Sequence, residues 1–461
     1  MRNGLLVLGA VSLGWAPVSS AQPAAYLNAA RSIREAALSS DRAYQRLAEL
    51  TDRVGPRLAG SPGDALAVAW ALRELKQDGL AAHTESVQVP HWERGEETAE
   101  LVEPARQQLI VTALGGSPPT PKEGIVAPVV SVASLEELEK LGEQVQGKIV
   151  LFNRAIWRDP RGMSGYSAVA PLRGSGAAAA ARQGAVAMLI RSLGTSSLRT
   201  PHTGGQDGAP GIPAVALSSE DADLIQRCLD RGETVKVRLR LGCRTLPDAE
   251  SANVIADLPG RERPEELVLI GAHLDSWDLG SGAFDDGAGV VIVMEAARLL
   301  KELGLVPRRT LRVVLFANEE NGLRGALNYA EAHAPELPHH IATIESDSGA
   351  DAPYGFSIGA PAPFETLVRG LIAPLQRIGA GELRSGGSGG ADTGPLFRAG
   401  VPALLLLQDT TRYFDYHHSP ADTFDKIDPW ALRLNVAALA IMAYALADLP
   451  ELSEARAQAR E

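Results

Sequence analysis

Residues 253–449 alternate short apolar runs with longer helical patterns, and this alternation restricts the possible folds more than any other feature of the chain. The run LVLIGA at 267–272 is short and apolar, which is typical of a strand buried on both faces. The same pattern predicts further strands at 310–317, 340–345 and 401–407, and helices at 288–303, 322–333, 363–378 and 429–449. Strands that alternate with helices predict an α/β fold with a mostly parallel central sheet covered by helices on both faces.

Residues 124–243 have a different composition. They combine short β-type runs with an alanine-rich helix at 174–184 and a loop rich in glycine, serine and threonine at 192–211. Ser218 is expected to cap a further helix. Because this block has strands and helices of its own but no cluster of catalytic residue types, we interpret it as a smaller domain inserted into the catalytic domain. The catalytic domain is then formed by residues 22–123 and 244–449, and residues 450–461 are a polar tail.

The segment before the insertion contains two helical patterns, at 26–50 and 64–79, separated by the turn-rich sequence VGPRLAGSPG at 54–63. Asp64 is expected to cap the second of these helices, and Gly79 to end it.

The first 21 residues predict a cleaved export signal. Arg2 supplies a positive charge, residues 5–15 form a short apolar run, and residues 19–21 are small, as at a cleavage site. A membrane anchor is the alternative, but the apolar run is short for about 30 Å of hydrocarbon. We therefore expect a mature chain that begins at Gln22, is not bound to the membrane, and is secreted or periplasmic.

The charge balance restricts the partners. The chain has 44 Lys and Arg against 56 Asp and Glu, a formal net charge of −12 at pH 7. An acidic chain without a basic run is not expected to bind nucleic acid. Two cysteines are too few for a disulfide framework, and the sequence leaves open whether Cys228 and Cys243 form one bridge or remain two thiols.

Carboxylates and imidazoles follow the predicted strands of the catalytic domain. The positions are His273, Asp275, Asp285, Asp286, Glu319, Glu320, Asp347, His417 and His418. Because ligand-binding residues of an open α/β sheet gather beyond the carboxyl ends of its strands, we expect these side chains to meet. So many carboxylates would repel one another without a cation. Imidazoles combined with carboxylates favour zinc over calcium, which prefers oxygen ligands alone.

Five motifs carry a family resemblance. They are GAHLDS at 271–276, FDDGAG at 284–289, NEE at 318–320, SDSG at 346–349 and HHSPADT at 417–423. In order and spacing they resemble the co-catalytic zinc exopeptidases, which include zinc aminopeptidases and glutamate carboxypeptidase II. The inserted block, with GKIVLF, GAVAMLI and IPAVALS, resembles a protease-associated (PA) domain. That insertion and the segment VGPRLAGSP make the carboxypeptidase Q group the nearest likeness.

The resemblance implies a role for each matching position. One zinc ion would be bound by His273, Asp285 and Asp347, and a second by Glu320, His418 and the bridging Asp285, with Glu319 as the general base. Asp275 would accept the second ring N–H of His273 and fix its tautomer. The peptide bond between Asp285 and Asp286 is typically cis in the family.

Three further positions are also candidates for a role at the site. Tyr416 is a candidate for stabilising the oxyanion, with an aromatic wall as the alternative. Asp392 lies where the family has an Asp near the site, and support of its loop ranks before substrate contact. His417 is expected to point elsewhere. The metal is assigned to His418 because the family's ligand directly precedes a Ser or Thr, as His418 precedes Ser419.

The resemblance therefore implies an exported enzyme with two Zn²⁺ per chain. It would hydrolyse dipeptides or short peptides through a metal-bridged water activated by Glu319. The alternatives are an aminopeptidase acting on longer peptides, a glutaminyl-cyclase-like transferase, and a non-catalytic receptor module of the same fold. All six ligand and base positions carry competent residues, which favours catalysis over the receptor role. The family also leads us to expect a homodimer.

Overall fold

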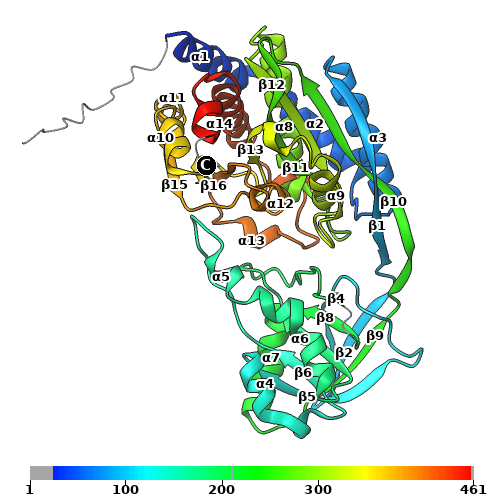
Figure 1. Ribbon diagram of the computed structural model, residues 1–461. Coiled ribbons are helices and arrows are strands. Elements are labelled where there is room, and N and C mark those ends of the chain that lie inside the picture. Colours follow the sequence, from blue (N-terminus) through cyan, green and yellow to red (C-terminus); the bar gives the residue numbers. More distant parts are fainter. Residues whose placement is uncertain (1–23, 209–210, 458–461) are drawn as a thin grey trace, which may run out of the picture.

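The computed structural model describes residues 24–208 and 211–457 of the chain. The predicted export signal at 1–21 and the end of the polar tail lie outside these residues. Figure 1 shows two units, a larger one that contains both ends of the described chain and a smaller one below it. The long strands β1 (Ala81–Glu93) and β10 (Arg244–Leu258) run from the larger unit to the smaller one (Figure 1).

The larger unit is built on an eight-stranded sheet with the strand order β1-β10-β12-β11-β13-β16-β14-β15. Besides β1 and β10, its strands are β11 (Arg263–His273), β12 (Arg309–Phe316), β13 (His340–Glu345), β14 (Pro353–Gly359), β15 (Glu382–Ser385) and β16 (Ala403–Gln408). The central strands β12, β11, β13 and β16 pair in parallel, whereas β10 and β14 join them through antiparallel pairs. The prediction of an α/β fold is confirmed.

Helices cover both faces of this sheet. They include α1 (Ala24–Ser39), α2 (Arg42–Glu49), α3 (Pro62–Gln77), α8 (Ala288–Glu302), α9 (Arg324–Ala332), α12 (Gly394–Arg398) and α14 (Pro429–Asp448). Val268 and Ile270 of β11 belong to a core that also contains α8 and α14. Leu269, between them, belongs to a second core with Tyr329 of α9 and Leu396 of α12. Because alternate residues of a strand face opposite sides, a strand covered on both sides has no polar position.

Helix α14 lies in the middle of the larger core. It is the one helix of the described chain that is long and apolar enough to cross a membrane, but 83% of its apolar stretch is buried inside the protein. It contacts α1, α8 and the strands β11 to β14. Its apolar composition is therefore explained by burial in the protein.

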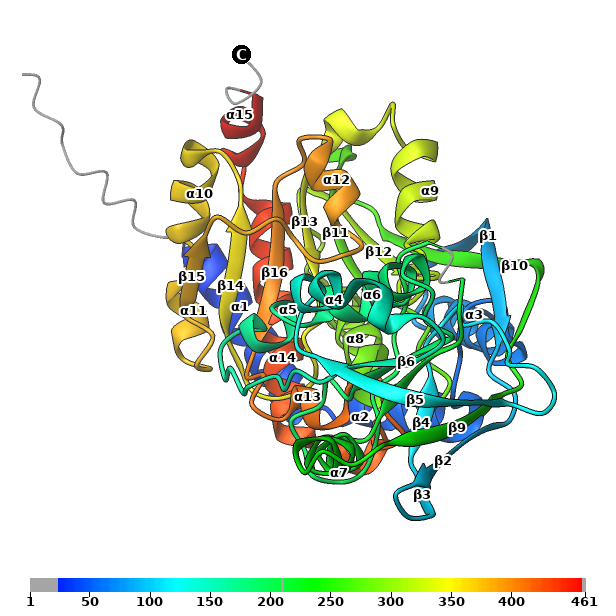
Figure 2. The ribbon, with the colours of Figure 1, turned by 90° about the horizontal axis from the view of Figure 1, so that it is seen from below.

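The smaller unit contains a second eight-stranded sheet with the order β3-β2-β9-β5-β6-β7-β8-β4. Its strands are β2 (Glu97–Glu103), β3 (Gln107–Leu109), β4 (Val111–Ala113), β5 (Ile125–Val132), β6 (Ile149–Phe152), β7 (Ala187–Arg191), β8 (Ala214–Leu217) and β9 (Lys236–Leu241), and its helices include α4 (Leu135–Leu141), α6 (Ala170–Arg182) and α7 (Ser219–Asp230). Ser218 caps α7 as predicted, because its hydroxyl accepts a hydrogen bond from the Asp221 amide at 3.1 Å. Seen from below, this unit lies in front of the larger one (Figure 2).

The second sheet begins earlier in the chain than the sequence pattern indicated. Strands β2 to β4 belong to it, although they precede residue 124, where the insertion was expected to start. Half-exposed strands on both sides of the boundary have the same alternation of polar and apolar residues, so the pattern alone cannot assign them to one sheet. We propose that the inserted unit begins near Glu97.

One predicted helix is interrupted. The pattern at 363–378 forms α10 (Ala362–Arg369) and a separate short helix, α11 (Ala373–Gln376). Gly370 ends the first helix, and Pro374 begins the second one within its first turn. Glycine lowers helix stability, and Pro374 has no N–H to donate to the carbonyl four residues earlier, which explains the break between the two helices.

The cap of α3 also differs from the prediction. Ser61, not Asp64, is the N-cap, since its hydroxyl accepts a hydrogen bond from the Asp64 amide at 3.2 Å. The Asp64 carboxylate in turn accepts one from the Gly60 amide at 2.8 Å. The two side chains satisfy main-chain donors at the helix start in the manner of a capping box.

The two cysteines are not bridged. Cys228 and Cys243 are both free and buried. Burial raises the pKa of the Cys243 thiol to about 11. Of the two alternatives that the sequence left open, the structure contains two unpaired thiols.

Candidate metal centre

The side chains proposed as metal ligands lie together at the carboxyl edge of the central sheet. His273 ends β11, Glu320 follows β12, and Asp347 follows β13. Asp285 lies in the turn Ala283–Gly287 that leads into α8, and His418 follows the short helix α13 (Tyr413–Tyr416). The carboxyl ends of parallel strands therefore meet at one place, as predicted.

Asp285 lies at the centre of the cluster. Its Oδ1 is 3.2 Å from Nε2 of His273, and its Oδ2 is 3.2 Å from Nε2 of His418. The same His273 nitrogen is 3.8 Å from Oδ1 of Asp347, and the same His418 nitrogen is 2.9 Å from Oε2 of Glu320. The two oxygens of one carboxylate thus face two different sets of side chains.

The donor set fits a divalent metal. Ligand atoms of His273, Asp285 and Asp347 all lie within 4.8 Å of one another. Oδ2 of Asp285 is buried and accepts no hydrogen bond, although it faces imidazole nitrogens. Buried carboxylates are normally paired or bound to a metal, and a mixed set of imidazoles and carboxylates suits zinc.

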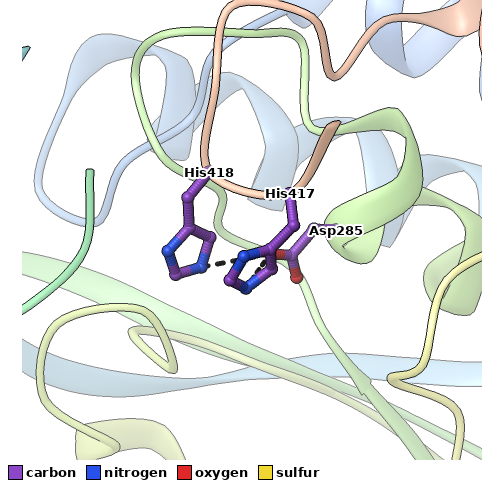
Figure 3. Close-up of side chains that lie close together, drawn as sticks. All are labelled: Asp285, His417 and His418. Atoms are coloured by element: carbon purple, nitrogen blue, oxygen red, sulfur yellow. Dashed lines mark ion pairs between the residues drawn. The ribbon is translucent and has the colours of Figure 1, made fainter. Parts of the chain in front are cut away.

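His417 also belongs to the cluster. Its ring is stacked on that of His418, with centroids 3.5 Å apart, and its Nε2 is 3.4 Å from Oδ2 of Asp285 (Figure 3). The expectation that His417 points away from the metal site is wrong. Asp285, His417 and His418 form a second group whose ligand atoms all lie within 4.8 Å of one another.

Asp275 supports the cluster through different atoms than expected. Nδ1 of His273 is 3.0 Å from the main-chain oxygen of Asp275, whereas the Asp275 carboxylate is 3.8 Å away, too far for a hydrogen bond. The carboxylate instead accepts hydrogen bonds from the main-chain amides of Glu319, at 3.0 Å, and Glu320, at 3.3 Å. The carbonyl of Asp275 therefore orients the imidazole, and its side chain holds the loop after β12.

Glu319 lies at the rim of the cluster and remains partly exposed. Burial raises the pKa of its carboxyl well above the ordinary value; His273 opposes this shift, and the neighbouring Asp347 and Glu320 add to it. Among the described residues, no Lys, Arg or His nitrogen lies within ion-pair distance of it. A free carboxyl with a raised pKa at the edge of such a site can exchange protons.

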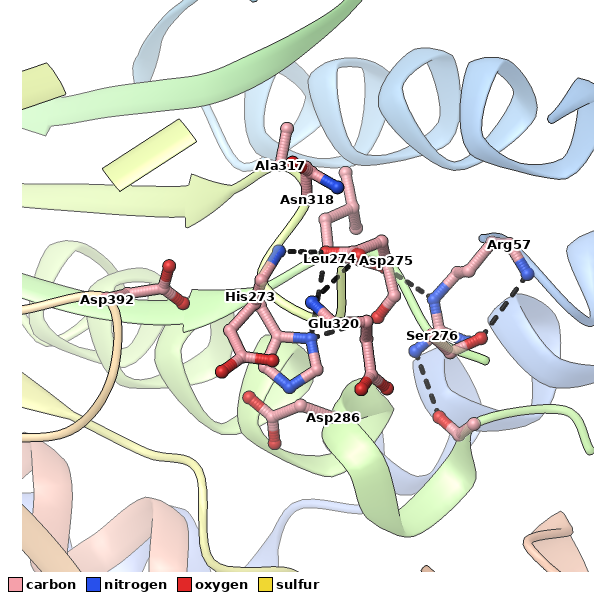
Figure 4. A network of polar contacts seen from close by, with 12 residues as sticks. Arg57, His273, Leu274, Asp275, Ser276, Asp286, Ala317, Asn318, Glu320 and Asp392 are labelled. Atoms are coloured by element: carbon pink, nitrogen blue, oxygen red, sulfur yellow. Dashed lines mark hydrogen bonds and ion pairs between the residues drawn. The ribbon is translucent and has the colours of Figure 1, made fainter. Parts of the chain in front are cut away.

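Asp286, which is labelled in Figure 4, follows Asp285 in the turn that leads into α8. The peptide bond between the two residues is cis, as in the family that the motifs resemble. The Oδ1 atom of Asp286 accepts a hydrogen bond from the Gly289 amide at 3.0 Å, and its Oδ2 is buried without a partner. Burial raises the pKa of this carboxyl well above its ordinary value.

Asp392 is fully buried, and neither of its carboxylate oxygens has a hydrogen-bond partner within residues 24–208 and 211–457. Burial raises the pKa of its carboxyl well above the usual range, and the nearby Glu345 and Glu319 add to the shift. Its main-chain amide donates to Oε1 of Glu345 at 3.2 Å, and the Thr393 amide donates to Oε2 at 2.6 Å. The loop that carries Asp392 is thus held by Glu345.

Tyr416 lies on the other side of the site. Its ring packs beside Phe284, with centroids 5.5 Å apart, and the side chains of Arg412 and Lys426 lie over it. This environment fits an aromatic wall residue.

The smaller unit reaches the cluster through its glycine-rich loop. The Thr203 amide donates to the main-chain oxygen of His418 at 2.9 Å, and the Thr203 oxygen is 3.4 Å from Nδ1 of the same histidine. Nearby, the Thr195 amide donates to the Phe414 oxygen at 2.9 Å. The loop that carries His418 is therefore held partly by the inserted unit.

Sequence reasoning missed two residues that hold the main chain of the site. Asp422 accepts hydrogen bonds from the amides of Ala283, Phe284 and Asp285. Arg57 is fully buried and donates to three carbonyls of the loops on either side of the site. Both occur in segments that the sequence singled out, HHSPADT and VGPRLAGSP. The signal available in the sequence was a charged residue inside each of these two segments.

Comparison with known proteins agrees with these observations. Residues 253–443 match the model of peptidase family M28, and residues 98–225 match that of the PA domain. Human carboxypeptidase Q is 40% identical over 418 residues, which cover 90% of this chain and 87% of the relative.

Solved structures show the same architecture. A peptidase M28 precursor from Shewanella amazonensis superposes with a TM-score of 0.90 at 41% identity, covering 92% of this chain and 97% of that one. A zinc aminopeptidase from Bacillus subtilis shares the fold, with a TM-score of 0.68 at 21% identity and coverage of 88% and 95%.

Proposed function

Because the chain belongs to peptidase family M28 and is a metallo-exopeptidase, we propose that it hydrolyses dipeptides or short peptides with two zinc ions. The residues that would hold these ions are His273, Asp285, Asp347, Glu320 and His418. The observation that supports this proposal is that the two oxygens of Asp285 face different imidazoles, those of His273 and His418, at 3.2 Å each. A carboxylate in this position can serve two cations at once.

The remaining ligands follow from the same distances. Asp347 would complete the set on the His273 side, and Glu320 the set on the His418 side. We assign the metal to His418 rather than His417 because the His418 nitrogen faces both Asp285 and Glu320. Among the described residues, the His417 nitrogen reaches only Asp285 within ion-pair distance.

Zinc at such a site acts as a Lewis acid that polarises the scissile carbonyl and acidifies water. Glu319 is the general base in this proposal. Its carboxylate takes a proton from the attacking water and delivers it to the leaving amine, and its partly exposed position beside the proposed ligands suits this role. Asp275 keeps this residue in place by holding its main-chain amide.

The proposed substrate is short because the inserted unit lies against the site. Thr203 contacts the main chain of His418, and a Cβ at Gly205 would lie 3.4 Å from the main-chain oxygen of Glu320. A wall this close to the metal ligands limits the length of peptide on that side. Aminopeptidase action on longer peptides is the second candidate, favoured by the shared fold with a zinc aminopeptidase.

A panel of dipeptides tests the proposal. The purified protein, with its zinc quantified, is assayed on free dipeptides, on dipeptides blocked at the amino or the carboxyl end, and on longer peptides. We expect zinc-dependent hydrolysis of free dipeptides, with one of the two blocked series resistant. Preference for longer peptides with a free amino end would support the aminopeptidase alternative, and zinc binding without hydrolysis of any peptide would contradict the proposal.

Export and assembly are separate proposals. The signal-like sequence at 1–21 supports export, so amino-terminal sequencing of protein from the periplasm or medium should begin at Gln22. An intact amino terminus on cell-associated protein would contradict export. The homodimer expected from the family is tested by light scattering of the purified chain.

A further inference from the structure

Arg57 is a buried cation whose guanidinium donates hydrogen bonds to main-chain carbonyls of the metal site. Its side chain is 0% exposed. Nε donates to the Leu274 oxygen at 2.5 Å, Nη1 to the Ser281 oxygen at 2.7 Å, and Nη2 to the Gly282 oxygen at 2.9 Å. Leu274 directly follows His273, and Ser281 and Gly282 precede Asp285, so one guanidinium holds both loops that carry ligands to the same metal.

The main chain of Arg57 is held against the same segment. Its amide donates to the Ser276 hydroxyl at 3.3 Å, and the Ser276 amide donates to the Arg57 oxygen at 3.4 Å (Figure 4). Gly282 has a left-handed conformation with φ of 58°, and a Cβ there would lie 2.8 Å from Nη1 of Arg57. A Cβ there would meet the Ser276 side chain even more closely, so a side chain at 282 would disturb both Ser276 and the guanidinium.

Asp422 holds the other polar groups of the segment 281–285. Its Oδ1 accepts from the amides of Ala283, at 2.9 Å, and Phe284, at 2.7 Å, and its Oδ2 accepts from the Asp285 amide at 3.2 Å. The carbonyls of Ser281 and Gly282 thus face the Arg57 guanidinium, and the amides of residues 283–285 face the Asp422 carboxyl group. Hydrogen bonds with one charged partner are roughly twice as strong as neutral ones, so this arrangement restrains the segment firmly.

The charge of Arg57 also lies among carboxylates. Asp422, Asp275, Asp286 and Asp285 all interact electrostatically with it. Several anions without a cation would repel one another strongly in a buried site. Arg57 lowers this repulsion from within the protein, independently of any bound metal.

We propose that Arg57 is a positioning residue for metal binding, which fixes the segment 281–285 so that Asp285 meets His273 and His418 at once. The inference rests on the proposed metal site. Residues that orient metal ligands typically contribute 10- to 100-fold to metal affinity. Substitution of Arg57 should therefore lower the zinc affinity beyond what a similar loss of folding stability elsewhere in the chain would cause.

The experiment compares Arg57→Met with Arg309→Met. Arg309 is a matched control, because it is also 0% exposed and donates to main-chain carbonyls, Leu449 at 2.6 Å and Pro450 at 3.2 Å. It lies at the start of β12, at the opposite end of the strand from Glu319. Zinc affinity is measured by competition with a chelator of known affinity, and thermal unfolding is measured on the metal-free proteins.

We expect Arg57→Met to weaken zinc binding about 10- to 100-fold and Arg309→Met to change it by less than about threefold, although both lower the unfolding temperature. Arg57→Lys retains the charge but not the three-way donor geometry, and it should fold while binding zinc about tenfold more weakly. Equal zinc affinity in Arg57→Lys and the wild type would overturn the inference alone. A wild-type protein that binds no zinc would overturn the proposed metal site, and this inference with it.

Discussion

The Asp275 carboxylate accepts a hydrogen bond from the main-chain amide of Glu319, with Oδ1 3.0 Å from the nitrogen. Asp275 is fully buried, and its Oδ2 accepts from the next amide, that of Glu320, at 3.3 Å. The carbonyl of the same residue orients His273. One residue therefore links the loop after β11 to the loop after β12 and controls the placement of both a proposed ligand and the proposed base.

Asp275→Asn should lower kcat/KM about 10- to 100-fold, the usual effect of removing a group that orients metal-site residues. The amide loses the charge and turns one acceptor oxygen into an N–H donor that faces a main-chain N–H. Steady-state kinetics with zinc quantification checks this, and the zinc content at saturating zinc should remain that of the wild type. Asp257→Asn is the control, since Asp257 pairs with Arg312 away from the site. Equal kcat/KM in Asp275→Asn and the wild type would contradict the linking role.

Glu319→Gln should remove nearly all hydrolysis while leaving zinc bound. Glutamine has the same shape but cannot accept the proton from water, and loss of a general base costs about 10²- to 10⁴-fold in rate. Turnover on a free dipeptide and zinc per chain are measured on the same preparation. Near-wild-type turnover would show that another group is the base.

Much of the site could be predicted because its side chains follow strands. The ends of β11, β12 and β13 place His273, Glu320 and Asp347 at the carboxyl edge of the sheet. Parallel pairing brings these strand ends together, so the prediction did not need the positions of the helices. The core of the fold was also predictable, because strands covered on both faces appear in the sequence as unbroken apolar runs.

The groups that hold the main chain were not predictable in this way. Arg57 and Asp422 bind main-chain carbonyls and amides. Because nearly every residue has these groups, the spacing of side-chain types in the sequence does not predict such contacts. The orientation of His417 was predicted wrongly, because the side chains of adjacent loop residues can point the same way. The His417 ring in fact stacks on that of His418. The interruption at Gly370 had a local signal in the sequence, whereas the start of the second sheet depends on pairing partners far along the chain.

His418→Ala should lower the zinc content from two to about one per chain, whereas His417→Ala should leave it near two. The reason is that Nε2 of His418 faces both Asp285 and Glu320, at 3.2 and 2.9 Å, while Nε2 of His417 lies 3.4 Å from Asp285 alone among the described residues. Zinc is quantified after gel filtration in metal-free buffer. Two zinc ions in His418→Ala and one in His417→Ala would reverse the assignment.

Removal of zinc by a chelator should abolish hydrolysis, and added zinc should restore it. The metal-free protein should also unfold more easily, because a ligand bound only to the folded state adds about 4 kcal/mol at a thousand times its dissociation constant. Activity and the unfolding temperature are followed through one cycle of chelation and zinc addition. Full activity in the chelated protein would rule out the proposed metal mechanism.

The metal-free protein should lose stability in acid through His340, which lies at the start of β13 away from the site. Its ring is 0% exposed and contacts the Tyr329 hydroxyl at 2.9 Å, and burial lowers its pKa from 6.5 to about 4. The unfolded chain therefore binds a proton below pH 6.5 that the folded chain binds only near pH 4. The stability contributed by the neutral ring is complete above pH 6.5 and is lost as the pH falls toward 4, by up to about 3 kcal/mol.

Urea unfolding at pH 7 and pH 5 checks this prediction. Between these two pH values, His340→Gln should lose less unfolding free energy than the wild type. His83→Gln, at a side chain that is 54% exposed, should lose as much as the wild type. Parallel losses in all three proteins would exclude His340 as the titrating group.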